Sequence, residues 1–378
     1  MRIAIITHEY YPVLSGGTVF TEKIAEELSK LGYEVDVLTA QVGATKRGRE
    51  VSGAFQVHRF ATARNSVSDS TLLEHVSYFG LGLPQMLAHA ARARYDLLFP
   101  VFAIPSGLLA LAISKALRVP SIVFVDAADT PGIESAMKSY VRHLTSVFRF
   151  VTNASAGVVV LEGLEDLALP HIHHQRVTTI PNGAVIPEQR ARPNQNGPAL
   201  QLLSIGRLVL RKGFQEILQA LGKVRRERSD FQLRIVGYGR AEDEIRRVLD
   251  ANDIAENVVF VGRVEYEKLG AQYLSSDAYL FYGDREGSSL AMIEAAAYGL
   301  PLIASDHPGN RTYVEHGKSG FLVAPRDPDA LAATILTLLN ARDELPKLGQ
   351  RSREIAEGYS WANVARRYDT FFRSVLGR

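Results

Sequence analysis

Two successive series of alternating apolar and amphipathic segments constrain the fold of this chain more than any other feature. The first series opens with the isoleucine-rich run Arg2–Thr7, which is typical of a strand buried on both faces of a parallel sheet. Helical spacing over residues 19–31 ends at Gly32, and a second strand is expected over residues 33–39. This order of strand, loop, helix and strand predicts a mononucleotide-binding unit.

The same alternation starts again at Leu200, after a polar segment. Residues 188–198 have no apolar periodicity and contain proline, asparagine and glycine, as expected of a linker. A chain of 378 residues also exceeds the size of one ordinary hydrophobic core. We therefore predict an α/β protein with two doubly wound, Rossmann-like domains, residues 1–187 and 199–359, that face each other across a cleft.

The composition and the apolar pattern exclude several classes of function. The formal net charge is +2, which gives no reason to expect a nucleic-acid partner. The absence of cysteine excludes disulfide frameworks, thiolate catalysis and cysteine-ligated metals. The apolar region over 97–125 is interrupted by prolines and charges, whereas a membrane-spanning helix needs about 20 continuous apolar residues. We expect a cytoplasmic protein, and peripheral contact with the inner face of the membrane stays open.

Two glutamates, Glu286 and Glu294, flank the start of a helix expected over residues 289–297. This helix is largely apolar, and burial of a lone carboxylate is costly, so Glu294 either has a partner or lies on an exposed stripe. At 1.5 Å per residue the two glutamates are about 12 Å apart, which is too far for the acid/base pair of a glycosidase. The separation suits two diols at the two ends of one extended ligand.

Cations and glycines in corresponding loops predict an anion site. Arg207 and Lys212 follow the first strand of the second domain, and Gly16 and Gly17 follow the first strand of the first domain. If these loops face each other, two cations and the free amides of a helix N-terminus converge on a site that suits a diphosphate.

Three other groups allow more than one interpretation. The polar loop 126–132 follows a strand, where open α/β sheets place ligands, but turn-forming aspartates explain it equally well. Histidines 171, 173 and 174 lack the spacing of a zinc site, so no metal is expected there. Basic residues within 46–49 and 138–149 favour solvated surfaces, with an anionic acceptor or a membrane as the alternative.

Taken together, these segments resemble the family 4 retaining glycosyltransferases of the GT-B fold. The segment from Glu286 to Glu294 is similar to the E-x7-E motif of that family, and the similarity covers nearly the whole chain. The last helix, residues 360–378, looks like the family's C-terminal helix, which packs back on the first domain. Other similar segments are Gly16-Gly17, Pro181-Asn182-Gly183, Gly206-Arg207, Lys212-Gly213, Gly237-Tyr238-Gly239 and Gly320–Val323.

The resemblance implies a site for a nucleoside diphosphate sugar and no metal or other cofactor. Glu294 would bind the ribose hydroxyls, and Glu286 would bind hydroxyls of the donor sugar. Arg207 and Lys212 would neutralise the diphosphate as charge develops on the leaving group. The remaining donor-binding residues that it implies are Gly16, Gly17, Gly287, Ser288, Ser289, Leu290, Gly237, Arg263 and Val264.

The chain departs from the family pattern at two places. Asp126 stands where many relatives have a histidine, so we expect Asp126 near the donor sugar, where it can accept but not donate a hydrogen bond when ionised. Ser288 and Ser289 stand where relatives usually have phenylalanine and glycine. Both changes make the identity of the donor sugar an open question.

The expected activity is a retaining hexosyl transfer from a UDP- or GDP-sugar to a hydroxyl of a carbohydrate, lipid-linked or small-molecule acceptor. Such a reaction would serve the synthesis of glycans, glycolipids or cell-surface polysaccharides. One alternative is a sugar-nucleotide epimerase or hydrolase on the same fold, and another is a non-catalytic subunit that binds a nucleotide sugar. The sequence does not predict the nucleobase, the acceptor or the oligomeric state.

Overall fold

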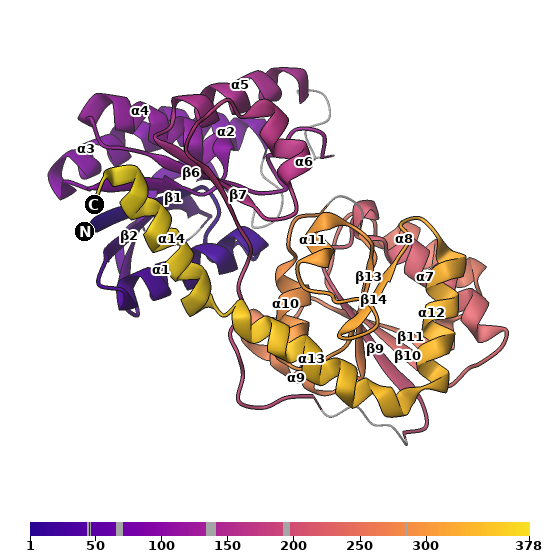
Figure 1. The fold of residues 1–378 in the computed structure, drawn as a ribbon. Coiled ribbons are helices and arrows are strands. Elements are labelled where there is room, and N and C mark those ends of the chain that lie inside the picture. Colours follow the sequence, from indigo (N-terminus) through magenta and orange to yellow (C-terminus); the bar gives the residue numbers. More distant parts are fainter. Residues whose placement is uncertain (44, 46, 66–70, 134–140, 192–196, 284–285) are drawn as a thin grey trace. The chain divides into compact units, whose positions relative to one another are not determined.

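The computed structural model describes residues 1–43, 45, 47–65, 71–133, 141–191, 197–283 and 286–378. The chain forms two compact units, of which Met1–Ile180 and Trp361–Arg378 make the first and Pro181–Ser360 the second (Figure 1). The predicted first domain extended to residue 187. The chain instead joins the second unit at Pro181, because Asn182 and Ala184 form hydrogen bonds with Ser288 and Tyr359 of that unit.

Apart from the antiparallel edge strand β3, the first unit is built on parallel strands. One sheet has the order β3-β4-β2-β1-β5, and a second has the order β6-β7-β8. Single bridges from Leu98 to Ser121 and from Val101 to Phe124 connect β5 with β6. The bounds are β1 Arg2–Thr7, β2 Glu34–Val42, β3 Gly48–Ser52, β4 Phe55–Arg64, β5 Leu97–Pro100, β6 Ile122–Val125, β7 Gly157–Leu161 and β8 Val177–Ile180.

Helices cover both faces of these strands (Figure 1). On one face, side chains of α3 and α4, among them Met86 and Leu109, pack against Ala4 and Leu38 of the sheet. On the other face, α1 and the C-terminal helix α14 lie against each other. The helices of this unit are α1 Gly16–Lys30, α2 Leu72–Ser77, α3 Leu83–Ala93, α4 Leu108–Leu117, α5 Val141–Ala154, α6 Glu165–Ala168 and α14 Trp361–Leu376.

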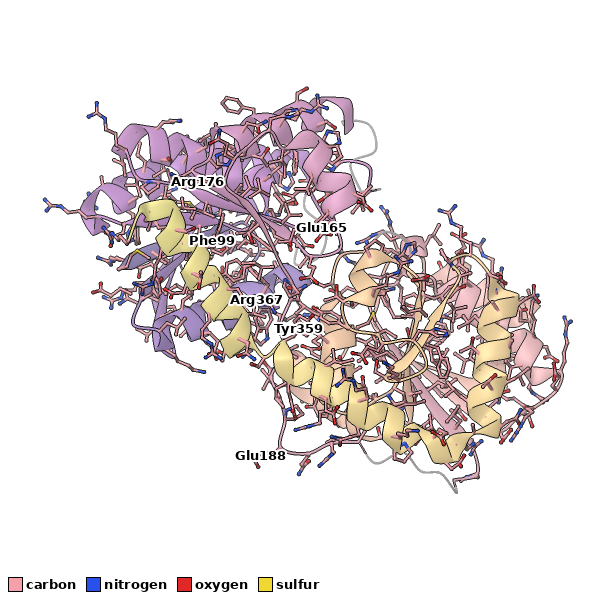
Figure 2. The ribbon with its side chains drawn as sticks, viewed as in Figure 1. Phe99, Glu165, Arg176, Glu188, Tyr359 and Arg367 are labelled. Atoms are coloured by element: carbon pink, nitrogen blue, oxygen red, sulfur yellow. The ribbon has the colours of Figure 1, made fainter. Side chains whose placement is uncertain are left out.

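Aromatic packing attaches α14 to the first unit. The ring of Phe99 in β5 lies 5.5 Å from the ring of Tyr368 and 5.1 Å from the ring of Phe372, and all three are buried. Arg176 donates a hydrogen bond to the carbonyl of Val375 at 2.9 Å. Figure 2 shows Phe99 and Arg176 beside this helix. The helix follows the whole second unit in sequence, yet its buried stripe belongs to the first.

The second unit has one sheet of six parallel strands in the order β11-β10-β9-β12-β13-β14. Numbered along the unit, this is the doubly wound order 3-2-1-4-5-6, whose direction reverses between β9 and β12. The doubly wound prediction is confirmed. The bounds are β9 Leu200–Ile205, β10 Phe231–Val236, β11 Val258–Gly262, β12 Ala278–Phe281, β13 Leu302–Ser305 and β14 Gly320–Val323.

Two separate cores bury the two faces of this sheet. One contains Ile217 of α7, Ile245 of α8 and Ile335 of α12. The other contains Met292 and Ile293 of α10, each fully buried, which at about 1.5–3 kcal/mol per side chain accounts for the apolar character of that helix. The helices are α7 Phe214–Arg225, α8 Glu242–Ala251, α9 Leu269–Leu274, α10 Leu290–Ala297, α11 Pro308–Arg311, α12 Pro328–Asn340 and α13 Leu345–Gly358.

Some elements differ from the prediction. Arg49, expected in a solvated loop, lies in the edge strand β3, which pairs antiparallel with β4 and is mostly exposed, so no apolar alternation reveals it. The strand β7 and the helix α13 were not predicted. Residue 46 and residues 134–140 of the predicted basic helix lie outside the described residues, as do 284 and 285 beside Glu286. Among the helices that the structure describes, none has the length and apolar character to cross a bilayer.

Candidate functional site

The carboxyl ends of β9 and β12 meet where the strand order of the second unit reverses, and their loops bring opposite charges together. The loop after β9 carries Arg211 and Lys212 in a single short helical turn. The loop after β12 carries Glu286. In open α/β sheets, ligands bind at this switch point.

Glu286 is buried, with 9% of its surface exposed, and its two oxygens face two cations. The Nζ atom of Lys212 lies 2.8 Å from Oε2, and the guanidinium of Arg211 pairs with Oε1. A buried carboxylate is tolerated when both oxygens have charged donors. The sequence pointed to Lys212 and Glu286 but missed Arg211, although it directly precedes Lys212. Arg207, the other predicted cation, is exposed in the same loop.

Close approach of backbones fixes the geometry of these loops. Gly213, next to Lys212, has a φ of +74°, and a Cβ atom there would lie 2.1 Å from the carbonyl oxygen of Tyr282 in the β12 loop. At Gly237, with a φ of +143°, a Cβ atom would lie 1.9 Å from the carbonyl oxygen of Gly206. Only glycine fits at these two positions. Gly237 thus has a packing role beside the predicted donor contact.

Glu294 lies inside α10 and is 8% exposed, so the exposed-stripe interpretation is wrong and the expectation of a partner is confirmed. The hydroxyl of Tyr266 donates to Oε1 at 2.7 Å, and the hydroxyl of Tyr273 donates to Oε2 at 2.9 Å. Burial and the charge of Glu294 hold the pKa of Tyr273 well above its usual range, so it stays a donor. Both tyrosines were missed. The signal was a helical segment with two tyrosines directly before the strand β12.

Asn182 forms two hydrogen bonds with the segment between the two glutamates. Its backbone N–H donates to Oγ of Ser288 at 3.1 Å, and its side-chain amide donates to the carbonyl of Ser288 at 2.7 Å. Tyr313 in turn donates to the carbonyl of Asn182 at 2.8 Å. A Cβ atom at Gly309 would lie 2.7 Å from the carbonyl oxygen of Gly287, so this part of the segment is closely packed.

The sequence predicted that amides at the start of α10 bind a donor, and this stays a prediction. Ser289 is the N-cap, and in the described structure its side chain makes no capping hydrogen bond. The first N–H groups of a helix, beginning here at Leu290, have no partner within the helix. An anion at this helix end would be stabilised by those amides and by the helix dipole.

The loops after β10 and β11 place the remaining predicted residues of the second unit. Arg263 is exposed, and its guanidinium carbon lies 5.5 Å from the ring centre of Tyr238, the neighbour of Gly237. Val264 is partly buried against the core around α10. Arg263 and the partly buried Tyr238 thus lie close together in the loops after β10 and β11.

In the first unit, Gly16 and Gly17 are the first two residues of α1, which begins earlier than predicted. Ser15 explains the early start, because its side chain caps the N–H of Thr18 at 3.2 Å. A Cβ atom at Gly17 would lie 2.6 Å from the ring of Phe102, so a larger residue would have to displace that ring. The two glycines therefore lie in the first turn of α1, and a contact of their amides with a donor stays a prediction.

Asp126 belongs to a tight turn after β6. The hydroxyl of Thr130 donates to the carbonyl of Asp126 at 2.7 Å, and the backbone N–H of Asp126 donates to Oδ1 of Asp129 at 3.0 Å. Asp129 also accepts the N–H of Ala103. Burial and the charge of Asp126 raise the pKa of Asp129 to about 8. These contacts support the turn interpretation for Asp129, and a contact of Asp126 with a sugar stays a prediction.

The histidines near residue 172 have protein partners. Nδ1 of His171 lies 3.1 Å from the guanidinium of Arg149, and Nε2 of His174 lies 3.0 Å from the carbonyl of Ser155.

Family comparisons match both halves of the chain. Residues 15–183 match a family model described as a glycosyl transferase 4-like domain, and residues 185–355 match one described as glycosyl transferases group 1.

Relatives with curated descriptions fall into two groups by coverage. An uncharacterized glycosyltransferase of Haemophilus influenzae is 31% identical over 42% of this chain and 44% of its own length. A GDP-mannose-dependent alpha-(1-6)-phosphatidylinositol monomannoside mannosyltransferase of Mycobacterium tuberculosis is 30% identical over 46% of this chain and 47% of its own. The chain therefore spans less than half of these two relatives. A glycogen synthase of M. tuberculosis is 26% identical over 97% of this chain and 92% of its own length.

Solved structures match along the full chain. The sucrose-phosphate synthase of Thermosynechococcus elongatus has a TM-score of 0.83 at 20% identity, covering 100% of this chain and 99% of that one. HepE of Anabaena, solved in complex with UDP and glucose, has a TM-score of 0.79 at 16% identity, covering 99% of this chain and 100% of that one. At these identities the similarity establishes the fold.

Proposed function

The chain belongs to the glycosyltransferases with a 4-like domain and a group 1 domain, and it has the GT-B fold; from this premise we propose that it transfers a hexosyl group from a UDP- or GDP-sugar to a hydroxyl acceptor, with retention at the anomeric carbon. The observation that carries this proposal is the buried Glu286 between Arg211 and Lys212, beside the N-terminus of α10.

The donor would lie along the carboxyl edge of the second sheet. Its diphosphate would bind Arg207 and Lys212 and the amides of Gly287, Ser288 and Leu290. Glu294 would accept hydrogen bonds from the ribose diol, and Tyr273 would keep that carboxylate in place. Positive charge from arginine and lysine would stabilise the leaving diphosphate without a metal ion.

In the proposed reaction, the acceptor hydroxyl attacks the anomeric carbon from the face that the diphosphate leaves. The new C–O bond forms as the bond from the anomeric carbon to the phosphate oxygen breaks. The hydroxyl proton moves to that phosphate oxygen, so the products are a glycoside and a nucleoside diphosphate. Glu286 would hold hydroxyls of the sugar during the transfer, with Asp126 of the first unit as a further candidate contact.

The names of two similar proteins support either a uracil or a guanine nucleotide as part of the donor. One relative is named as GDP-mannose-dependent, and HepE was solved with UDP and glucose. The guanidinium of Arg263 and the ring of Tyr238 are groups on which the flat face of either base could stack. A location in the cytoplasm, with peripheral membrane contact for a lipid-linked acceptor, is part of the same proposal.

The first test is a thermal-shift panel of UDP, GDP, ADP and their sugars. At least one nucleoside diphosphate should raise the melting temperature, and the double variant Arg207→Ala/Lys212→Ala should lose that shift. Lys347→Ala is the matched control, because this lysine is exposed and pairs only with Glu344 in the described part of the chain. If no nucleotide stabilises the wild-type protein, the proposal is wrong.

The second test separates transfer from the two rivals. With a responsive donor and a panel of acceptors, a transferase releases nucleoside diphosphate in step with a new glycoside of unchanged anomeric configuration. Formation of an epimer, or stoichiometric hydrolysis without acceptor, would favour an epimerase or hydrolase. Nucleotide binding without any product across the panel would favour a non-catalytic subunit.

A further inference from the structure

A second group of titratable side chains lies at the amino-terminal half of the strands of the first unit, away from the strand ends that carry the predicted donor loops. It consists of Asp36 in β2, His58 in β4 and His89 in α3. One ligand atom from each residue lies within 4.8 Å of the other two. The parallel register brings them together, since Leu38 pairs with His58 and Asp36 stands two residues earlier on the same face.

Asp36 is buried and offers one of its two oxygens. Oδ2 accepts hydrogen bonds from Arg2 at 2.9 Å and from the hydroxyl of Tyr95 at 2.7 Å. Oδ1 faces Nε2 of His58 at 3.5 Å.

One ring nitrogen of each histidine belongs to this group. Nε2 of His58 is buried and has no hydrogen-bond partner among the described residues. Nε2 of His89 lies 2.9 Å from the hydroxyl oxygen of Tyr95. Tyr95 gives its proton to Asp36, so its oxygen accepts from Nε2 of His89, and the other ring nitrogen of a neutral His89 carries no proton.

We propose that Asp36, His58 and His89 bind one divalent transition-metal ion of the zinc type. Two ligands at 2.0–2.1 Å from a tetrahedral ion lie about 3.3 Å apart, close to the 3.5 Å between Asp36 Oδ1 and His58 Nε2. Tyr95 and Arg2 orient the first ligands, as the outer partners of metal sites do. A guanidinium on one carboxylate oxygen leaves the other oxygen to the metal.

This site would have a structural role. Its ligands come from two strands and from the helix that covers them, so a bound ion would tie β2, β4 and α3 together. Three protein ligands leave a fourth position for water. Binding to the folded chain alone would raise its stability in proportion to the logarithm of the free metal concentration.

The experiment is a zinc titration of the full chain after treatment with a chelator. A chromogenic chelator competes for the metal, and Co²⁺ serves as a visible-absorption probe of coordination. The wild type should bind one Zn²⁺ per chain and melt at a higher temperature with zinc than without it. His58→Gln and His89→Gln should each weaken binding by at least about 100-fold, since loss of an outer partner alone costs 10–100-fold.

His173→Gln is the matched control, because His173 is exposed and lies on another part of the unit. It should leave the affinity unchanged. Circular dichroism without metal checks that each variant is folded, and Asp36→Asn replaces any histidine variant that is not. The proposal is overturned if the wild type binds no zinc, or if folded variants at two of the three positions bind zinc as tightly as the wild type.

Discussion

Glu286 and Glu294 of the second unit are buried to a similar extent, but different groups offset the cost of burying their charges. Glu286 is held by two cations, whereas Glu294 is held by two tyrosine hydroxyls. In the proposed reaction these environments fit different tasks. A carboxylate among cations can stay ionised beside a diphosphate, and a carboxylate among neutral donors can exchange one hydroxyl for a ribose hydroxyl.

At residue scale, Arg211 and Lys212 should have separable effects. Arg211→Ala should weaken binding of a nucleotide sugar about tenfold, equivalent to about 1.4 kcal/mol, and leave binding of the nucleoside diphosphate nearly unchanged. The reason is that Arg211 would hold Glu286 on the sugar, whereas Lys212→Ala would weaken both ligands. Calorimetric titration of both ligands measures the split. Equal losses for both ligands in Arg211→Ala would contradict this assignment.

Tyr273→Phe should destabilise the protein by about 1–3 kcal/mol, because it removes a buried donor from Glu294. Urea denaturation followed by circular dichroism measures the change. Tyr298→Phe is the control, since its ring stacks on Tyr273 with centroids 5.0 Å apart while its hydroxyl makes no described hydrogen bond to Glu294. Its effect should stay within about 0.5 kcal/mol. Similar losses of stability in both variants would contradict a stabilising hydrogen bond from the Tyr273 hydroxyl to Glu294.

Asp129 should make stability depend on pH. Its folded pKa of about 8 lies above the ordinary value of an aspartate, so between about pH 4 and 8 the folded chain keeps a proton that the unfolded chain has released. Its contribution therefore lowers stability as pH rises through this window, by at most about 1.4 kcal/mol per pH unit. Urea denaturation at several pH values should show a flatter profile for Asp129→Asn. An unchanged profile would mean that Asp129 ionises normally.

At the scale of elements, the candidate site depends on two loops, after β9 and after β12, that lie this close together only because Gly213 has no side chain. Gly213→Ala places a Cβ atom 2.1 Å from the carbonyl of Tyr282, so the loop of Arg211 and Lys212 must move away from the loop of Glu286. Gly317→Ala is a matched control with the same φ of +74° and open space around its Cβ. It should cost about 1–2 kcal/mol from backbone strain alone.

Gly213→Ala should cost clearly more than this control and should abolish nucleotide stabilisation in thermal shift. If the two alanine variants are equally stable and bind nucleotide equally well, close packing of the two loops does not matter for the site.

At the scale of the whole molecule, the C-terminal helix returns to the unit in which the chain began. Phe372→Ala should destabilise the first unit by about 3–5 kcal/mol, because Phe372 is fully buried against Phe99 and Tyr368. Hydrogen exchange should show lost protection in β1, β5 and α1. Protection in β9 and β10 should be retained. The exposed Arg373→Ala is the control, and a loss spread equally over both units would contradict the assignment of α14 to the first unit.

The sequence by itself determined most of the elements and the class of fold. Continuous apolar runs such as Arg2–Thr7 and Ala278–Phe281 indicate strands buried on both faces, and helical spacing between them implies a parallel, doubly wound sheet. The apolar helix with one carboxylate also predicted a partner for Glu294. These predictions succeed because a buried face places apolar residues in a regular pattern along each strand or helix. The edge strand β3 is mostly exposed and polar, so it has no such pattern and was missed.

Only the tertiary structure decided which side chains meet. Arg211 and Glu286 are 75 positions apart, Tyr273 and Glu294 are 21 apart, and Asn182 reaches Ser288 over 106. Each contact depends on strand order, register and the exact height at which a loop leaves the sheet. No local pattern encodes those quantities, because they follow from how whole elements pack. The cluster of Asp36, His58 and His89 has the same origin, since two strands and a helix create it.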